Sequence, residues 1–190
     1  GMPELPRNIA QILDLFAEAF GVRLILFGGS GGGFASLAVQ TFLNSPSVAF
    51  VWNPQTSIAR YHANAVRAFA RIAWGAGDSG YEEACSVVKN SCLLHDVTTS
   101  RISAEHSVLY IQNRSDTFHV ESHAAEYFRQ HGLSFSGGGV YLVDCNLVAW
   151  LGDWGVGHVV PPAGMIVHVL KSLASSSHLP SVISDLVQSP

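Results

Sequence analysis

The chain has 190 residues, of which 48% are hydrophobic and only 13% are charged. This length predicts one domain with a sizeable core, and the apolar content excludes a chain that is disordered throughout. The net charge of -4, with Lys and Arg residues scattered along the chain, excludes the basic surface of a nucleic-acid-binding protein.

Hydropathy and cysteine content bear on where the protein resides. No apolar run reaches the length of a membrane span, and the first residues lack the pattern of a secretory signal peptide. Cys85, Cys92 and Cys145 have no metal-ligand spacing, so we expect buried thiols in a reducing compartment. We therefore expect a cytoplasmic protein with no membrane span and no nucleic-acid partner.

The predicted elements alternate between helix and strand along the chain. Residues 5–20 place apolar side chains at helical spacing, and Gly21 follows at the position of a C-cap. Short apolar segments predict four strands, at residues 23–27, 48–52, 107–112 and 139–144. Later helices are expected at 120–130 and 162–175. The alternation predicts an α/β fold over a single domain at 1–190, with a three-layer parallel sheet of about four strands flanked by helices.

The segment at 53–106 is long for a connection between two strands. It carries helical patterns at 59–73 and 81–90, separated by a glycine-rich break at 75–80. Such an excursion predicts a helical, cap-like addition to the domain. Two interpretations stay open, a lid over a site and a decoration that only covers the sheet.

Residues 28–33, Gly-Gly-Ser-Gly-Gly-Gly, lie between the first strand and a helical pattern. A strand, a tight turn and a helix with serine at the apex form a nucleophile elbow, G-x-S-x-G, which lifts the hydroxyl clear of the sheet. Gly28 and Gly32 supply the small residues expected where strand and helix nearly touch. The alternative is a loop that binds phosphate through backbone N–H groups, although the dinucleotide fingerprint fits poorly and the P-loop lysine is missing.

A serine nucleophile needs a histidine base and an acid that orients the base. Asp116 follows the third predicted strand, and His158 lies in the loop after the fourth, so Ser30, Asp116 and His158 occur in a suitable order at strand ends. The competing acids are Asp78, Asp96, Asp144 and Asp153.

Two histidines offer a different interpretation of the same region. His119 and His123 lie one helical turn apart and could pair as metal ligands. No third ligand occurs at a suitable spacing, so we expect a histidine at a helix start and one at the surface. The sequence thus predicts neither a metal nor a cofactor.

From about residue 5 to residue 175, the chain resembles the α/β-hydrolase superfamily. More narrowly, it is similar to bacterial hydrolase-like domains associated with surface-polysaccharide synthesis or accessory secretion. The phrases that carry the resemblance are GSGGGFASL from residue 29, WNPQT from residue 52, QNRSD from residue 112 and GHVVPP from residue 157. The resemblance implies a nucleophile at Ser30, an acid at Asp116 and a base at His158.

The resemblance also implies a truncated domain, because members of the superfamily carry several strands before the nucleophile. Those strands supply an oxyanion-hole donor, so the donors here are expected from the N–H of Gly31 and its surroundings. We expect Gly29, Gly31, Asn53 and Gln55 to form the oxyanion hole and pocket. The apolar edge at residues 24–27 should be covered by the N-terminal helix, by a second copy in a homodimer, or by a missing N-terminal region.

The leading functional hypothesis is a serine hydrolase, esterase-like, that cleaves or transfers an acyl ester of a small molecule or glycan. The alternative is a non-catalytic hydrolase-like module that binds a glycan or protein within a polysaccharide-synthesis or secretion assembly. A third possibility is phosphate binding at the glycine-rich turn.

Overall fold

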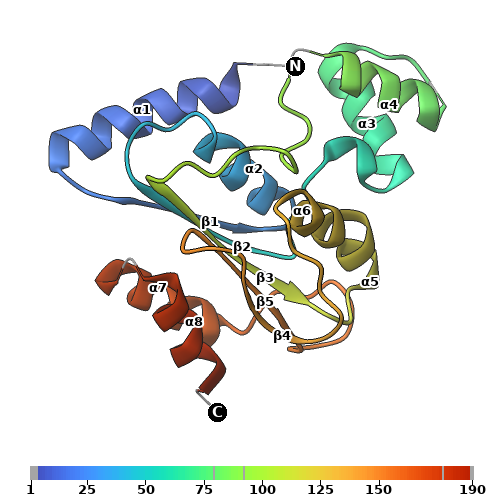
Figure 1. Cartoon of the computed structure of the whole chain (residues 1–190). Helices are drawn as coiled ribbons and strands as arrows, with labels where there is room; N and C mark the ends of the chain where they lie inside the picture. The colour runs from blue at the N-terminus through green and yellow to red at the C-terminus, as the bar shows by residue number, and fades with distance from the viewer. Residues whose placement is uncertain (1–3, 79, 92, 177, 189–190) are drawn as a thin grey trace.

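The computed structural model describes residues 4–78, 80–91, 93–176 and 178–188. A five-stranded sheet in the order β1-β2-β3-β5-β4 forms its centre (Figure 1). The strands are β1 (Leu24–Gly29), β2 (Ser47–Trp52), β3 (His106–Asn113), β4 (Gly139–Leu142) and β5 (Leu147–Gly152). β1, β2, β3 and β5 are parallel, and β4 joins β5 as an antiparallel edge strand.

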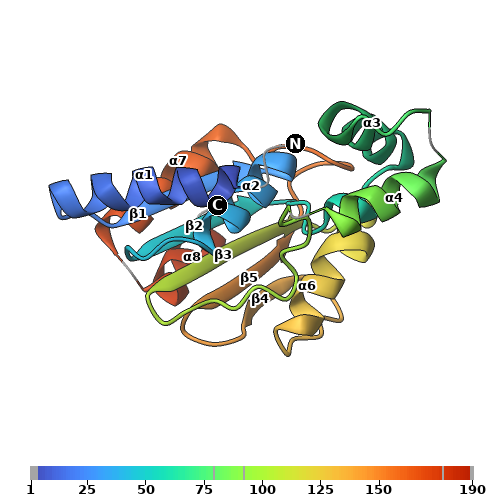
Figure 2. The ribbon, with the colours of Figure 1, turned by 90° about the horizontal axis from the view of Figure 1, so that it is seen from above.

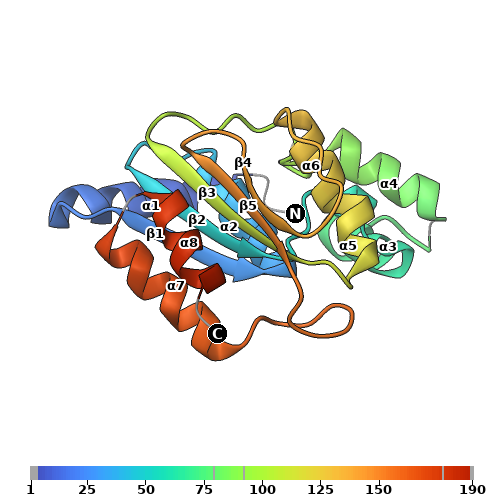
Figure 3. The ribbon, with the colours of Figure 1, turned by 60° about the horizontal axis from the view of Figure 1, so that its bottom comes forward.

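Helices cover both faces of the sheet, which confirms the predicted three-layer α/β architecture. One face packs against α2 (Ser30–Gln40) and α6 (Ala125–Gln130), and the other packs against α7 (Ala163–Ser175) and α8 (Leu179–Gln188) (Figures 1 and 3). Alternate strand residues serve the two layers, as the period of two requires. Ala49, for example, joins the α2–α6 core, whereas Phe50 joins the α7–α8 core.

The fourth parallel strand lies later in the chain than the sequence predicts. The segment predicted at 139–144 begins as β4, but this strand is antiparallel and ends at Leu142. Asp144 then makes the turn, because its carboxylate accepts hydrogen bonds from the N–H groups of Asn146 and Leu147 at 2.7 and 2.8 Å. β5 follows and pairs with β3, so it is the strand that leads into the His158 loop.

The segment between β2 and β3 forms a small helical unit. It contains a 3₁₀ turn (Ile58–Arg60), α3 (Ala63–Trp74) and α4 (Tyr81–Asn90), which project beyond the sheet (Figure 2). The unit has its own apolar core, built around Val66 and Ala70 of α3 with Ala84 and Val88 of α4. The predicted cap-like excursion is therefore a packed helical hairpin.

The N-terminal helix α1 (Leu5–Phe20) has the predicted bounds and ends at Gly21, whose φ of 61° is the left-handed conformation of a C-cap. It packs with Ala17 against Leu24 of β1. β1 is the outermost strand, so α1 covers it from one face only.

The cysteines differ from one another in their surroundings. Cys85 is buried in the α3–α4 core, as predicted, but Cys145 is exposed in the turn after β4, where a thiol has no apolar layer to enter. Cys92 lies outside the described residues. Within the described part of the chain, no helix combines the length and apolar character that a bilayer crossing requires.

Candidate active site

Ser30 occupies the sharp turn between β1 and α2 in the conformation that a nucleophile elbow requires. Its φ of 51° lies in the left-handed region, where a residue other than glycine costs on the order of 1–3 kcal/mol. Such strain persists only where the surroundings enforce it. Here the backbone closes tightly, since a Cβ built on Gly28 would lie 2.8 Å from the carbonyl carbon of Gly32.

The glycines of this turn are required for different reasons than the motif predicts. Gly28 is needed for the close approach of strand and helix, as expected, but a Cβ on Gly32 would meet nothing within 4 Å. The second tight position is instead Gly33, where a Cβ would lie 2.6 Å from the Cβ of Pro54. The glycine that α2 directs at the segment after β2 is therefore Gly33 and not Gly32.

Asp116 and His158, which the sequence predicts as acid and base, lie side by side and are hydrogen-bonded to each other. Asp116 follows β3 and is buried, and its Oδ2 accepts a hydrogen bond from the Nδ1 of His158 at 2.5 Å. Burial alone would raise the pKa of Asp116, but hydrogen bonds from His158 and His119 outweigh it and lower the pKa. The carboxylate therefore stays ionised and fixes the His158 tautomer that carries its proton on Nδ1.

His119 is a third member of this group, and the sequence reasoning set it aside. Its buried ring donates from Nδ1 to Asp116 Oδ1 at 3.1 Å, and it stacks on His158 with a centroid distance of 4.1 Å. Asp116 also caps the short helix α5 (Thr117–His119) by accepting from the His119 N–H at 3.3 Å. The D-x-x-H spacing at a helix start was the signal that could have revealed it.

The sequence analysis considered a metal-ligand pair of His119 and His123 and did not predict it, and the structure groups His119 with other residues. Asp116, His119 and His158 place possible ligand atoms within 4.8 Å of one another. One carboxylate and two imidazoles are donors that a divalent metal accepts. In this structure both imidazoles direct Nδ1 at the carboxylate of Asp116, so the carboxylate fixes the orientation of both rings.

His123 is buried, not at the surface as predicted. It lies in a π-helical turn (Val120–Ala124) between α5 and α6, and its Nδ1 accepts a hydrogen bond from the Thr56 N–H at 3.2 Å. Burial, followed by the charge of His119, lowers the pKa of His123 to about 3. His123 is therefore a neutral structural histidine that ties the segment after β2 to the helix after β3.

Asn53, predicted to line the pocket, is buried and links the ends of two strands and a loop. Its Oδ1 accepts from the Asn113 N–H at 2.7 Å, and its Nδ2 donates to the Val159 carbonyl at 2.9 Å. Its φ of 41° is also left-handed. Gly29 likewise has a packing role, because a Cβ there would lie 2.0 Å from the indole nitrogen of Trp52.

The loop that carries His158 is held by polar groups from the end of β3. Asn113 donates from Nδ2 to the carbonyls of Gly155 and Gly157 at 2.9 and 2.7 Å. Arg114 forms an exposed ion pair with Asp153 in the same loop. Asp153 is thus paired with an arginine. Two of the other competing acids also have partners: Asp96 forms an ion pair with Arg60, and Asp144 accepts hydrogen bonds within its own turn.

Ser30 lies at the same edge of the sheet as the acid and base, but it is not hydrogen-bonded to His158. The four parallel strands end at this edge of the sheet. Gly29 at the end of β1 pairs with Trp52 of β2, and Asn113 at the end of β3 pairs with Gly152 of β5. The described contacts give the Ser30 hydroxyl one partner, the Gln55 Nε2, which donates at 3.4 Å. The side chain of Gln55 thus contacts the turn that carries Ser30.

Searches of protein-family models, curated proteins and solved structures found no match to this chain. The function must therefore be argued from the residues at the edge of the sheet.

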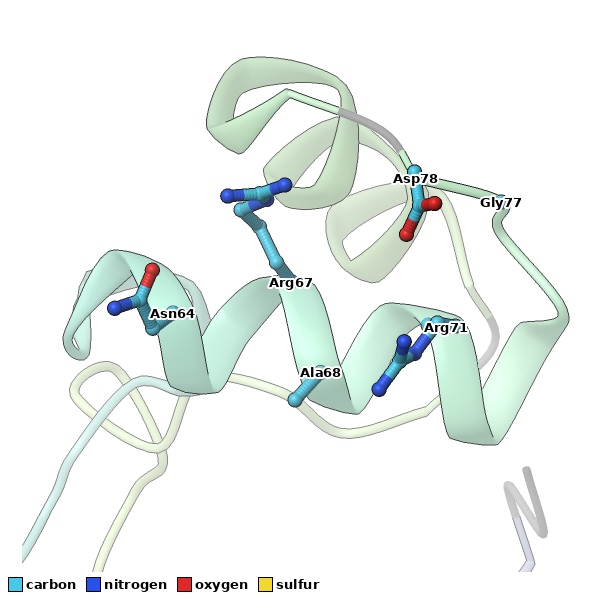
Figure 4. A pocket seen from close by; sticks show the side chains of 6 residues that line it. All are labelled: Asn64, Arg67, Ala68, Arg71, Gly77 and Asp78. Atoms are coloured by element: carbon cyan, nitrogen blue, oxygen red, sulfur yellow. The ribbon is translucent and has the colours of Figure 1, made fainter.

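Two hollows lie near the α3–α4 unit. One, of about 300 Å³, reaches the elbow at Gly31 and Gln55 and is otherwise lined mainly by apolar side chains. The other, of about 150 Å³, is formed by polar residues of α3 and the loop after it, including Arg71 and Asp78 (Figure 4). Asp78, one of the competing acids, lines this second hollow, and none of the predicted catalytic residues does.

Proposed function

We propose that this chain is a serine hydrolase or acyltransferase that acts on an ester, with Ser30, His158 and Asp116 as its catalytic triad. The observation that carries the proposal is the 2.5 Å hydrogen bond between Asp116 and His158 at the sheet edge where the strained Ser30 elbow also lies. The order of nucleophile, acid and base after β1, β3 and β5 of one parallel sheet also supports membership of the α/β-hydrolase superfamily.

The proposed reaction has two steps. The Ser30 oxygen attacks the acyl carbon while its proton passes to Nε2 of His158, and the leaving alcohol then takes that proton as the ester bond breaks. Water, or an acceptor hydroxyl, attacks the acyl-serine by the same route and restores the hydroxyl of Ser30. Asp116 remains ionised throughout and stabilises the imidazolium that forms. The ring of His158 must approach Ser30 for this chemistry, and its side chain is 41% exposed.

The oxyanion hole would be formed by two donors from different strand ends. The N–H of Gly31, the residue after the nucleophile, is the usual first donor. The second is the side-chain amide of Gln55, which already donates to the Ser30 hydroxyl. A side-chain amide can fill this role, and it would replace the donor that upstream strands normally provide.

Labelling with a fluorophosphonate probe tests the proposal. We expect the chain to be labelled, the Ser30→Ala variant to lose labelling and ester turnover, and Asp116→Asn to lower turnover by about 10⁴. Ser36→Ala, on the same helix, is the matched control and should retain labelling. A probe reaction that survives Ser30→Ala would overturn the assignment of the nucleophile.

The alternative of a non-catalytic binding module has one observation in its favour, the absence of a Ser30–His158 hydrogen bond among the described contacts. This module would bind a glycan or protein partner at the strand-end edge. It predicts an unlabelled Ser30 in a protein that is otherwise folded. The same probe experiment, run on protein whose circular dichroism is native-like, separates the two functions.

We also propose that a second copy of the chain covers α1. Five apolar side chains form one exposed stripe along the helix, at Leu5, Ile9, Ile12, Phe16 and Phe20. Their exposed fractions of 37–67% correspond to an exposed apolar area of roughly 450–500 Å². A standard interface buries about 800 Å² on each partner, and its apolar part is of similar size to this area. The spacing of three and four residues suits an antiparallel pair of helices about a two-fold axis.

A further inference from the structure

The 300 Å³ cavity lies between the core of the sheet and the core of the helical unit. On the sheet side it is walled by Phe34 of α2, which packs against the core shared by α2 and the sheet. On the other side it is walled by Ile58, Tyr61 and Phe69, which pack against the α3–α4 core. We propose that this cavity binds the acyl chain of the substrate, and that the preferred acyl group is a medium-length apolar chain and not acetyl.

The cavity begins where the acyl carbon would be held. Gly31, the first oxyanion donor in the proposed function on which this inference rests, lines its mouth together with Gln55. Gln55 is also the hydrogen-bond partner of the Ser30 hydroxyl at 3.4 Å. A chain attached to a carbonyl carbon at Ser30 therefore meets this cavity next to the two donors.

The lining selects against charged groups. None of the described residues that line it carries a charge. A phosphate or carboxylate inside the cavity would lose its hydration without gaining an ionic partner, whereas methylene groups would gain by leaving water. The arginine-containing hollow on the outer side of α3 (Figure 4) has the opposite chemistry and half the volume.

The volume sets the expected length of the chain. A cavity of 300 Å³ stands at the lower end of the range for small-molecule sites, about 300–1,000 Å³. It accommodates an acyl chain of about four to eight carbons, since each methylene occupies about the volume of one water molecule, near 30 Å³. An acetyl group would leave most of the apolar wall exposed to water.

Ala65 provides a place to close the cavity without disturbing a core. It lies on the exposed side of α3 and lines the cavity, whereas its neighbour Val66 is fully buried. A tryptophan at position 65 would occupy the space of the chain. Ala63 on the same helix is also exposed and does not line the cavity, so Ala63→Trp is the matched control.

The test is hydrolysis of p-nitrophenyl esters from acetate to octanoate by the full chain. Each buried methylene contributes about fourfold to kcat/KM, so we expect octanoate to exceed acetate by at least about 100-fold. Ala65→Trp should remove this preference, whereas Ala63→Trp, outside the cavity, should keep both the preference and the turnover of the parent. Equal kcat/KM for acetate and octanoate in an active enzyme would overturn the acyl cavity and leave the proposed function standing.

A binding measurement separates this inference from the failure of catalysis. Isothermal titration of octanoate into the Ser30→Ala variant should give saturable binding, which the double variant Ser30→Ala/Ala65→Trp loses and Ser30→Ala/Ala63→Trp retains. If no ester is turned over and no probe labels Ser30, the proposed function fails, and this titration still decides the cavity. Absence of saturable octanoate binding would then overturn the cavity as well.

Discussion

At the scale of single residues, the side chain of Gln55 has the most specific consequence. If its amide completes the oxyanion hole, Gln55→Ala should lower kcat by about 10²–10³ with little change in KM, because the donor acts mainly on the transition state. Steady-state kinetics with an activated ester measures both constants. Gln130→Ala, which removes an exposed amide bonded to Glu126, is the control and should leave kcat unchanged. An unchanged kcat in Gln55→Ala would assign the second donor elsewhere.

The buried His123 predicts how stability depends on pH. Its pKa is about 3 in the folded protein, against about 6.5 in an unfolded chain. Between these values the unfolded state binds one more proton, so the free energy of unfolding falls as pH falls below about 6.5. One such proton contributes a slope of up to about 1.4 kcal/mol per pH unit.

The His123→Gln variant should flatten that slope, because its amide oxygen can still accept from the Thr56 N–H without titrating. Urea unfolding at several pH values between 7 and 4.5 measures the slope in each protein. The exposed His178 offers a control, and His178→Gln should keep the slope of the parent. The same slope in parent and His123→Gln would show that His123 is not held neutral.

At the scale of elements, the junction of β1 and α2 depends on Gly28 more than on Gly32. Gly28→Ala would force a Cβ to within 2.8 Å of backbone atoms, so we expect a loss of about 1–3 kcal/mol in the free energy of unfolding. Gly32→Ala adds a methyl group in open space within a helix and should gain about 0.5–1 kcal/mol. Urea unfolding of both variants measures the difference. Equal stabilities would contradict the tight approach of strand and helix.

The same elements show what could be predicted from the sequence. Local sequence patterns are sufficient to predict α1, the strands β1 to β3, and the positions of Ser30 and Asp116 at strand ends. Each of these features depends on a few neighbouring residues in the sequence. β5 cannot be predicted in this way, because its apolar run, Leu147–Gly152, follows the turn made by Asp144 so closely that no separate strand is apparent. The role of Asn53 and the stacking of His119 on His158 depend on residues from other strands and loops, which spacing along one chain does not reveal.

At the scale of the whole molecule, the exposed stripe of α1 predicts self-association. We expect a dimer at micromolar concentration by sedimentation velocity, and a monomer for Ile12→Glu, because a buried charge without a partner opposes the interface. Gln11→Glu changes the adjacent exposed residue away from the stripe and should remain dimeric. A parent protein that sediments as a monomer at these concentrations would contradict a second copy on α1.

The link made by Asn53 has a further consequence for how the proposed activity would be lost on heating. One amide group joins the end of β2 to the backbone of β3 and to the stretch that follows His158. The loop after His158 therefore cannot unfold locally before the sheet does, because breaking the bond to its Val159 carbonyl also disturbs the buried hydrogen bonds between the parallel strands. Thermal inactivation and global melting should then coincide, and an early phase in which an inactive protein keeps an intact fold should be absent.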